Sequence, residues 1–379
     1  MEASLKLGNG DWGVKNDSLL AYDDVGGKFR PLPFDFTRAS SATVVNKQGL
    51  IETVQSGIPR IDFSDDANGA LKLEPQSTNL ITYSEDFSNS SWTKLNGATV
   101  TADTIISPDG TLNADSFTFT TSPSDKLQKV VTVAPSVKYT VSCYIKSDSN
   151  ITIKMGGATA ASPINVTTEW VRHTITQTNS ATTTAYPQIT SNGTAGTVYI
   201  YGFQLEQSSY ATSYIPTQGA ISTRVADSAN GAGNSTVINS TEGVLYAEIS
   251  ALADDGTFRL LSFSDGTSVN RVYIGYSSVD KITCSFQIAS SPVYGFDFTT
   301  DINVNSKLAL KYKENDFALW VNGVEVNSQS SGNTFPIGTL TKMQFTSGTV
   351  SSPFYGNTKG LKYYPKALAD VQLEDLTTI

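Results

Sequence analysis

The sequence predicts an all-β protein, with an extended N-terminal segment, two antiparallel β-sandwich domains and one short C-terminal helix. Three observations support this prediction. Apolar and polar residues alternate in stretches such as 139–145 and 282–288, which is the period of a half-buried strand. Gly, Ser and Asn separate these stretches at short intervals, as in β-sandwiches and jelly rolls. Only residues 365–377 place apolar side chains at helical spacing.

Composition limits the function classes. The chain has 379 residues, enough for two or three hydrophobic cores. Charged residues make up 16%, against about a quarter in typical globular domains. The net charge of −9 argues against a nucleic-acid binder, which needs a basic face. There is no apolar run long enough to insert in a membrane, and the N-terminus has no apolar signal region. We therefore expect synthesis in a cytoplasm without export.

The chain divides into four predicted parts. Residues 1–78 hold turns and short extended pieces that bury too little to fold alone, and we interpret them as an attachment or assembly segment. Residues 79–216 and 237–379 form the two sandwiches, and residues 217–236 form a small-residue linker. Within the second sandwich, Asn322-Gly323 predicts a type I′ hairpin turn. The C-terminal helix should bury the stripe Leu368, Val371, Leu373 and Leu376.

The residue types that carry catalysis are scarce. The single histidine, His173, shares a predicted strand face with Val171 and Ile175, and we interpret it as structural. Cys143 and Cys284 are 141 residues apart and lie in alternating strands, so we expect buried thiols rather than a disulfide. One histidine and two distant cysteines cannot complete a zinc site. With no nucleophile motif in the chain either, we expect no enzymatic activity.

Two acidic groups have a functional alternative. A glycosidase needs only two carboxylates across a sugar cleft, and Glu242, Glu248, Asp254 and Asp255 are candidates. The strand pattern E-x-D-x-x-E is missing, so we interpret them as surface acids. The loops Asp254–Gly256 and Ser264–Ser268 could hold Ca²⁺, with metal-free hairpin turns as the alternative. No other cofactor is expected.

Aromatic residues are the candidates for sugar binding, because rings stack on the apolar faces of sugars. We select three for glycan binding, with core packing as the alternative for each: Trp320, Trp170 and Tyr294. Trp320 is the best of them, since strand alternation sets it opposite Leu319 and Val321. In the N-terminal segment, Trp12, Phe34 and Phe36 either pack within the protomer or dock into neighbouring subunits.

The order of short motifs carries a resemblance. "RASSAT" at 38–43, "GLI" at 49–51, "PRID" at 59–62 and "TNL" at 78–80 resemble a segment of bacteriophage virion proteins of the head-fibre or tail-fibre type. "YTVSCYIKSD", Trp170 and "YIYGFQLEQSSYATSYIPT" are similar to the carbohydrate-binding-like jelly roll that follows this segment. "GLKYYPKALADVQLEDL" is similar to the end of concanavalin A-like or laminin G-like sandwiches.

The resemblance implies a structural fibre or decoration protein on a virion surface, made in the host bacterial cytoplasm. It implies a homotrimer whose N-terminal segment contacts capsid or tail proteins, with Trp12, Phe34, Phe36, Arg38 and Arg60 as attachment candidates. The sandwiches would adhere to host surface glycans. A dedicated receptor-binding lectin and a glycan depolymerase remain alternatives, and capsid or tail location stays open. We also expect Arg38 and Arg60 to form ion pairs with nearby acids.

Overall fold

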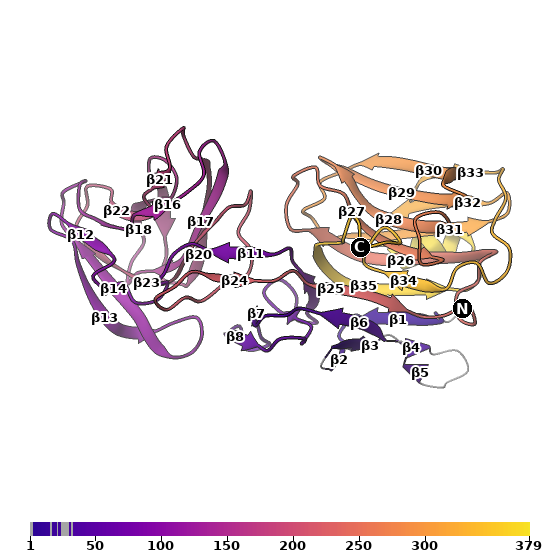
Figure 1. Cartoon of the computed structure of the whole chain (residues 1–379), viewed down its shortest axis with the longest axis horizontal. Helices are drawn as coiled ribbons and strands as arrows, with labels where there is room; N and C mark the ends of the chain where they lie inside the picture. The colour runs from indigo at the N-terminus through magenta and orange to yellow at the C-terminus, as the bar shows by residue number, and fades with distance from the viewer. Residues whose placement is uncertain (1–2, 16, 21, 24–29, 32) are drawn as a thin grey trace. The chain divides into compact units, whose positions relative to one another are not determined.

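A computed structural model describes residues 3–15, 17–20, 22–23, 30–31 and 33–379. The chain folds into two compact units (Figure 1). Unit 1 consists of Met1–Ala39, Gln55–Pro75 and Ala226–Ile379, and unit 2 consists of Ser40–Val54 and Gln76–Val225. Almost all regular structure is antiparallel strand, which confirms the predicted fold class.

Unit 2 contains two five-stranded antiparallel sheets in its described residues. In spatial order, the first sheet contains β13 (Thr99–Ile106), β14 (Leu112–Phe119), β23 (Gly196–Glu206), β17 (Lys138–Lys146) and β20 (Val171–Thr178). The second contains β12 (Thr93–Leu95), β15 (Lys126–Gln128), β22 (Gln188–Ser191), β18 (Ile151–Gly156) and β19 (Ser162–Val166). Three two-stranded pairs accompany them: β7 (Ala42–Val45) with β8 (Ile51–Val54), β11 (Ser77–Asn79) with β24 (Ser222–Arg224), and β16 (Val131–Thr132) with β21 (Thr184–Ala185).

The core of unit 2 follows the predicted alternation. Val141, Cys143 and Ile145 of β17 are buried and share one cluster with Ile153 and Ile189 of the second sheet. Side chains two residues apart on a strand point to the same face, so the alternating pattern closes the two sheets on each other.

Unit 1 contains two larger sheets, again counted over the described residues. The first runs β33 (Val324–Gln329), β32 (Phe317–Val321), β31 (Ser306–Lys313), β26 (Glu242–Ala251), β35 (Gly356–Tyr364), β1 (Leu5–Gly8), β4 (Tyr22–Asp23) and β5 (Arg30–Pro31), with β10 (Ala70–Leu73) on β35 and β9 (Ile61–Asp62) on β10. The second runs β2 (Gly13–Lys15), β3 (Ser18–Leu20), β6 (Phe34–Thr37), β25 (Ser228–Ala232), β34 (Lys342–Gln344), β27 (Arg259–Ser264), β28 (Arg271–Ser278), β29 (Lys281–Ile288) and β30 (Ser291–Thr299).

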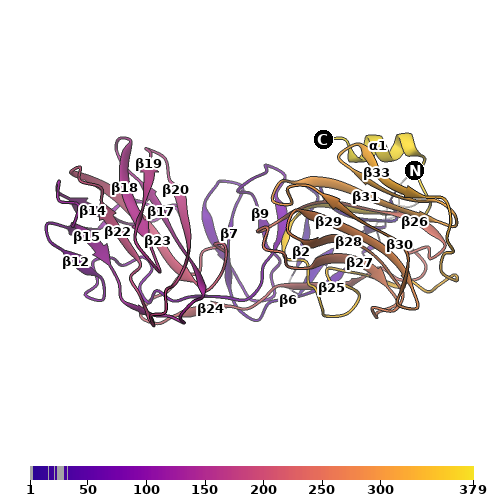
Figure 2. The same cartoon turned by 90° about the horizontal axis from the view of Figure 1, so that it is seen from above.

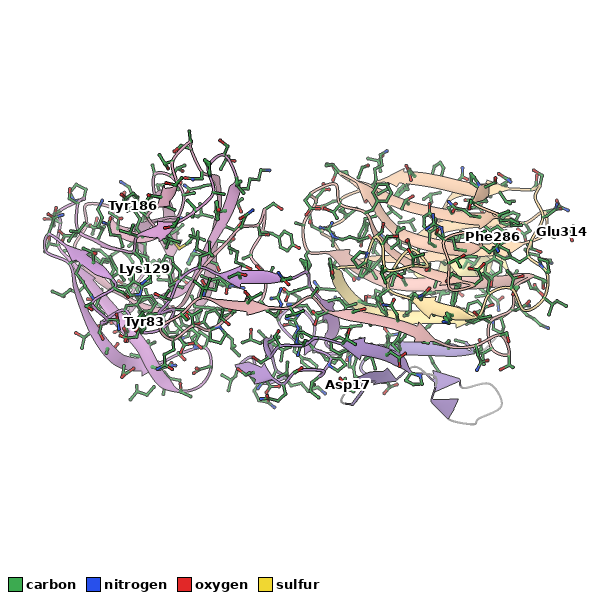
Figure 3. All side chains as sticks on the ribbon, in the orientation of Figure 1. Asp17, Tyr83, Lys129, Tyr186, Phe286 and Glu314 are labelled. Atoms are coloured by element: carbon green, nitrogen blue, oxygen red, sulfur yellow. The ribbon has the colours of Figure 1, made fainter. Side chains whose placement is uncertain are left out.

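The N-terminal residues supply strands to the core of unit 1. β1 pairs antiparallel with β35, and β6 pairs with β25. Leu5, Phe34 and Leu71 are fully buried in the same cluster as Phe286 of β29, whose position Figure 3 marks. The units therefore differ from the predicted boundaries of a separate segment 1–78 and a linker 217–236. The small residues Ala229 and Ala232 lie buried in a central strand rather than in a flexible connection.

The short helix and the hairpin turn are where the sequence places them. α1 (Asp370–Thr377) lies on the outer side of the first sheet, next to β31 and β33 (Figure 2). Leu368 and Leu373 are buried, but Val371 is 64% exposed. At 100° per residue, position 371 points almost opposite to 373, so the predicted stripe is wrong at Val371. Asn322 and Gly323 both have positive φ, 50° and 83°, as a type I′ turn requires.

Both cysteines are free, buried thiols, as predicted. Burial raises the pKa of the Cys284 thiol to about 12, and it raises the pKa of Cys143 further. Neither thiol is available as a thiolate at neutral pH.

Four buried charged residues of unit 1 form one ion cluster. Arg38 Nη1 lies 3.0 Å from Asp227 Oδ1, and Arg60 contacts Glu74 Oε2 at 2.6 Å and the other oxygen of Asp227. The Asp227 backbone N–H also donates to the Glu74 carbonyl. Burial alone would lower the pKa of Arg60, but the charges of Glu74 and Asp227 raise it. The ion pairs expected for Arg38 and Arg60 are confirmed.

Removing the shared carboxylate should destabilise unit 1 strongly. We expect Asp227→Ala to lower the free energy of unfolding by about 3–5 kcal/mol, because Arg38 and Arg60 each lose a buried carboxylate contact, while Arg60 keeps that of Glu74. The matched control is Asp66→Ala, which breaks the half-exposed 2.9 Å ion pair with Lys359 and should cost about 1 kcal/mol or less. Urea unfolding of both variants measures the difference, and equal losses would contradict the role of Asp227.

Candidate functional site

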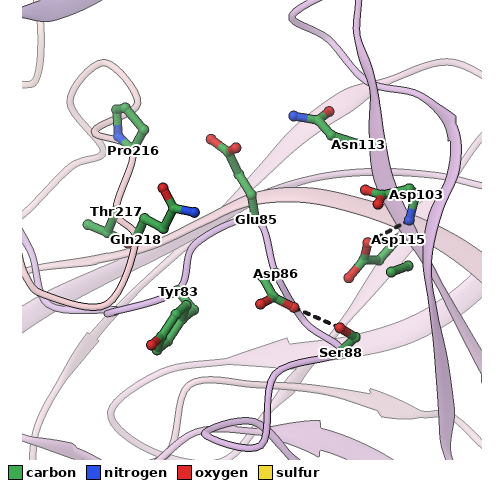
Figure 4. Close-up of a pocket in the computed structure, with 11 residues that line it drawn as sticks. Tyr83, Glu85, Asp86, Ser88, Asp103, Asn113, Asp115, Pro216, Thr217 and Gln218 are labelled. Carbon is green, nitrogen blue, oxygen red and sulfur yellow. Dashed lines mark hydrogen bonds between the residues drawn. The ribbon is translucent and has the colours of Figure 1, made fainter.

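A hollow of about 490 Å³ lies in unit 2, and we call it the Tyr83 pocket. Its walls come from the segment after β11, from β13 and β14, and from the segment before β24. They are formed by Tyr83, Glu85, Asp86, Ser88, Ala102, Asp103, Asn113, Asp115, Pro216, Thr217 and Gln218. Figure 4 shows Glu85 in the middle, with Tyr83 and Gln218 on one side and Asn113, Asp103 and Asp115 on the other.

Ser84 joins two of these walls, although they are far apart in sequence. Its hydroxyl accepts a 2.8 Å hydrogen bond from the backbone N–H of Thr217, 133 residues away. Tyr83 and Gln218 form an antiparallel bridge beside it. Gly219 follows with a φ of 90°, and a Cβ there would lie 3.5 Å from the Tyr83 hydroxyl. The turn thus sets the Tyr83 ring and the Gln218 amide at the same edge of the pocket.

Asp115 holds the third wall. Its two carboxylate oxygens accept backbone hydrogen bonds from Phe87 at 2.9 Å and from Asp103 at 3.0 Å. The pairing of β13 with β14 shifts register between Thr101 and Ile105, and Asp103 within this irregularity has a φ of 54°. The irregularity points Ala102 and Asp103 into the pocket wall instead of continuing a regular ladder, as bulges beside binding sites do.

Two buried polar atoms of the pocket walls have no hydrogen-bond partner within the described structure. They are the Thr217 Oγ1, on a side chain that is 8% exposed, and the Asn113 Oδ1. A buried polar atom without a partner costs about 1–3 kcal/mol.

The pocket is acidic. Four carboxylates line it, those of Glu85, Asp86, Asp103 and Asp115, and its lining holds no Lys or Arg. Burial raises the pKa of Asp115 and of Glu85 above their usual values. For Asp86 burial acts in the same direction, but hydrogen bonds from Ser88 and Asn89 outweigh it and lower the pKa.

The ammonium of Lys129, which is outside the pocket lining, contacts the Tyr83 ring. The Lys129 ammonium lies 5.7 Å from the centre of the Tyr83 ring and 5.6 Å from that of Trp92 (Figure 3). Lys129 also donates to Ser91 Oγ at 2.8 Å, and the Trp92 indole donates to the Tyr83 carbonyl at 2.8 Å. These contacts pack the Tyr83 ring against Lys129 and tie its backbone to Trp92.

The three aromatic residues predicted to bind glycans lie apart from this pocket. Trp320 is 7% exposed and packs in the cluster beneath α1. Tyr294 is 2% exposed, stacks on Phe317 and donates to the Asn327 carbonyl at 3.2 Å. Trp170 is half-buried in unit 2, with its indole N–H on the Ile106 carbonyl at 3.2 Å. Trp320 and Tyr294 expose too little ring surface to stack on a sugar.

Four of the five predicted attachment residues lie in the interior of unit 1. Phe34 and Phe36 are fully buried, and Arg38 and Arg60 belong to the ion cluster. Trp12 is half-buried and donates its indole N–H to the Asn68 carbonyl at 2.8 Å. Their first role is therefore in the fold of unit 1.

The other acidic candidates have structural hydrogen bonds. Glu242 accepts from the Ala367 backbone, and Glu248 accepts from Asn305 at 2.9 Å. Asp254 accepts from the Asp280 backbone, and Asp255 pairs with Arg259 at 2.7 Å.

The second candidate calcium loop is a hydrogen-bonded turn. Asp265 accepts from the backbone and hydroxyl of Thr267, and these bonds outweigh the effect of burial and lower its pKa. Among the described residues, no group of three or more His, Cys, Asp or Glu side chains could hold a metal ion. His173 lies on β20, and burial lowers its pKa.

Comparison with known proteins gives only distant similarities. No protein-family model matches the chain, and no curated protein matches it. The sialidase carbohydrate-binding module CBM40 of Ruminococcus gnavus is 19% identical over 39% of this chain and 93% of its own, with a TM-score of 0.33. The tandem CBM22 domains of Paenibacillus barcinonensis Xyn10C are 11% identical over 76% of this chain and 98% of their own, with a TM-score of 0.29. Similarities of this strength identify no ligand for this chain.

Sequence reasoning missed the Tyr83 pocket, although its first wall lies in the stretch "TYSEDFS". Strand alternation predicts which side chains are buried, but not which distant loops meet. The signal that could have helped is the density of acids there, since Glu85, Asp86, Asp103 and Asp115 fall within 31 residues that contain one lysine.

The opposite pKa shifts give a direct test of the pocket geometry. On acidification we expect Asp115 and Glu85 to take up protons before Asp86, because burial dominates for the first two and hydrogen bonds dominate for the third. Carboxyl ¹³C NMR titration measures the three groups separately. An Asp115 that titrates at or below the pH of Asp86 would show that it is not buried as described.

Proposed function

We propose that this chain is a carbohydrate-binding structural protein of a bacteriophage virion, and that the Tyr83 pocket of unit 2 is its glycan site. The observation that carries the glycan site is the pocket itself: one oriented aromatic ring, exposed amide and carboxylate groups, and two buried polar atoms without partners. Concave sites with one aromatic surface and a few convergent polar groups are the usual form of small-ligand pockets.

A sugar matches these groups better than other small ligands do. Its apolar ring face packs against Tyr83, while its hydroxyls donate to carboxylates and exchange hydrogen bonds with the Gln218 amide. The volume of about 490 Å³ lies within the roughly 300–1,000 Å³ of ligand sites.

The charge of the pocket selects among sugars. Four carboxylates without a lining cation repel an anionic glycan, because like charges brought together cost several kcal/mol. Neutral sugars, and sugars that carry a free amine, are the class that this pocket accepts.

The virion role rests on the resemblance of residues 7–92 and of the strands that follow to phage fibre proteins. The weakly charged, almost all-β chain is consistent with a protein exposed on a particle. Among the described residues, no helix is long and apolar enough to cross a membrane. We further propose a homotrimer held by capsid or tail proteins, either as a fibre or as a receptor-binding lectin.

Loss of the aromatic surface should weaken glycan binding. We expect Tyr83→Ala to lower the affinity for neutral glycans by at least about tenfold, equivalent to about 1.4 kcal/mol, on a glycan array and in calorimetry. The matched control is Tyr186→Ala, because Tyr186 is 46% exposed on unit 2 and lies outside the pocket lining. Binding that survives Tyr83→Ala but fails in Tyr186→Ala would move the site elsewhere, and a preference for anionic glycans would overturn the charge argument.

Immunogold labelling of intact particles with an antibody to unit 1 tests the virion role. Label on the capsid or on the tail supports it and decides between the two locations, whereas particles without label would refute it. Analytical ultracentrifugation of the full chain should give a trimer, and a monomer would exclude that part of the proposal.

A further inference from the structure

A second, smaller cavity lies in unit 1, between β25 and the segment that follows β34. Its volume is about 190 Å³, and we call it the Tyr355 crevice. It is lined by Leu73, residues 226–230, Phe345, Thr346, Val350, Pro353, Phe354 and Tyr355. None of these residues belongs to the Tyr83 pocket, and none lies in unit 2.

Backbone hydrogen bonds hold the two segments that border the crevice. Phe345 donates its backbone N–H to the Ala229 carbonyl at 3.1 Å, and Phe354 then donates to the Phe345 carbonyl at 2.9 Å. The loop between them closes on itself through the 3.0 Å backbone hydrogen bond from Ser347 to Ser351. Val350 at its tip is 92% exposed. The backbone segments that line the crevice are thus held in place by hydrogen bonds.

Two buried polar atoms of the crevice lining have no partner in the described part of the protein. Thr346 is 4% exposed, and its Oγ1 makes no hydrogen bond. Asn230 donates its Nδ2 to Ser228 Oγ at 2.8 Å, but its Oδ1 is orphaned. An amide oxygen and a hydroxyl in one lining are suited to a ligand that presents hydroxyl groups.

The crevice offers no free charge. Asp227 lines it, but both oxygens of its carboxylate contact arginines of the ion cluster. Burial, and then the nearby charge of Asp227, raise the pKa of Tyr355, so its phenol stays a neutral donor. Phe345, Pro353 and Phe354 give the crevice an apolar wall.

We propose that the Tyr355 crevice binds one neutral monosaccharide unit, independently of the Tyr83 pocket. An apolar wall with neutral hydrogen-bonding groups takes a ligand with one apolar face and several hydroxyls. The cavity is below the roughly 300–1,000 Å³ of sites for larger ligands, which suits a single sugar ring. An ionic ligand would find no counter-charge here, because Asp227 is already neutralised.

The test uses the full-length chain carrying Tyr83→Ala, which removes the contribution of the other pocket. Saturation-transfer NMR with the methyl glycosides of glucose, galactose, N-acetylglucosamine and N-acetylgalactosamine should show binding of at least one. Adding Thr346→Val should weaken that binding by about tenfold. It should leave the free energy of unfolding unchanged or higher, because the lost hydroxyl has no intramolecular partner.

Thr358→Val is the matched control. Thr358 is 1% exposed and also carries an orphaned hydroxyl, but it lies on β35 outside the crevice. We expect Thr358→Val to leave the affinity for the glycosides unchanged and not to lower the free energy of unfolding. The proposal is overturned if none of the four glycosides binds, if Thr346→Val with an intact fold leaves binding unchanged, or if glycerol binds as well as the glycosides. A failure of glycan binding in the Tyr83 pocket would leave this test valid, because the test is made with the Tyr83→Ala chain.

Discussion

The buried carboxylate of Asp227 is the constraint on which unit 1 depends. It receives Arg38 and Arg60, which come from the N-terminal third of the chain, and its own backbone pairs with Glu74. Charges taken out of water are tolerated only with their partners. Arg38 follows β6, Asp227 precedes β25 and Glu74 follows β10, so this one contact fixes which strands can meet. The N-terminal strands are thereby committed to a sandwich completed by residues 226–379.

The ion cluster explains why two arginines of the predicted attachment segment are buried in a weakly charged β-protein. The charges of "TRASS" and "PRIDF" are not spread on a surface. Arg38 and Arg60 are among the largest fully buried side chains of the chain, while Phe34 and Phe36 beside them fill the core. A stretch that looks too polar to fold alone folds because its cations meet one anion supplied from more than 150 residues away.

Sequence periodicity predicted what depends on local geometry. The alternation in β17 and β29, the Asn322-Gly323 turn and the buried thiols follow from side-chain direction and from φ preferences. Periodicity could not predict which distant segments pack against each other. The stripe on α1 failed at Val371, because the spacing was read without following the turn angle of the helix. Residues 217–236 were interpreted as a linker because small residues suit both a flexible connection and a tight central strand, and only the packing around Ala229 and Ala232 decides between them. For the same reason an aromatic residue in a strand, such as Trp320, could not be assigned to a ligand or to the core.

The same limit applies to the binding sites, and it shows what distinguishes them. Both cavities contain a buried threonine whose hydroxyl has no partner, Thr217 in one unit and Thr346 in the other. They differ in whether acids are neutralised. In the Tyr83 pocket four carboxylates belong to the lining, and the nearest cation, Lys94, acts on Asp86 and Asp115 from outside it. The field there therefore discriminates by ligand charge. In the Tyr355 crevice the single carboxylate is held by arginines, so discrimination must come from shape and hydroxyl placement. The ion cluster that organises unit 1 therefore also sets the chemistry of its cavity, because the anion that holds the strands is no longer free to attract or repel a ligand.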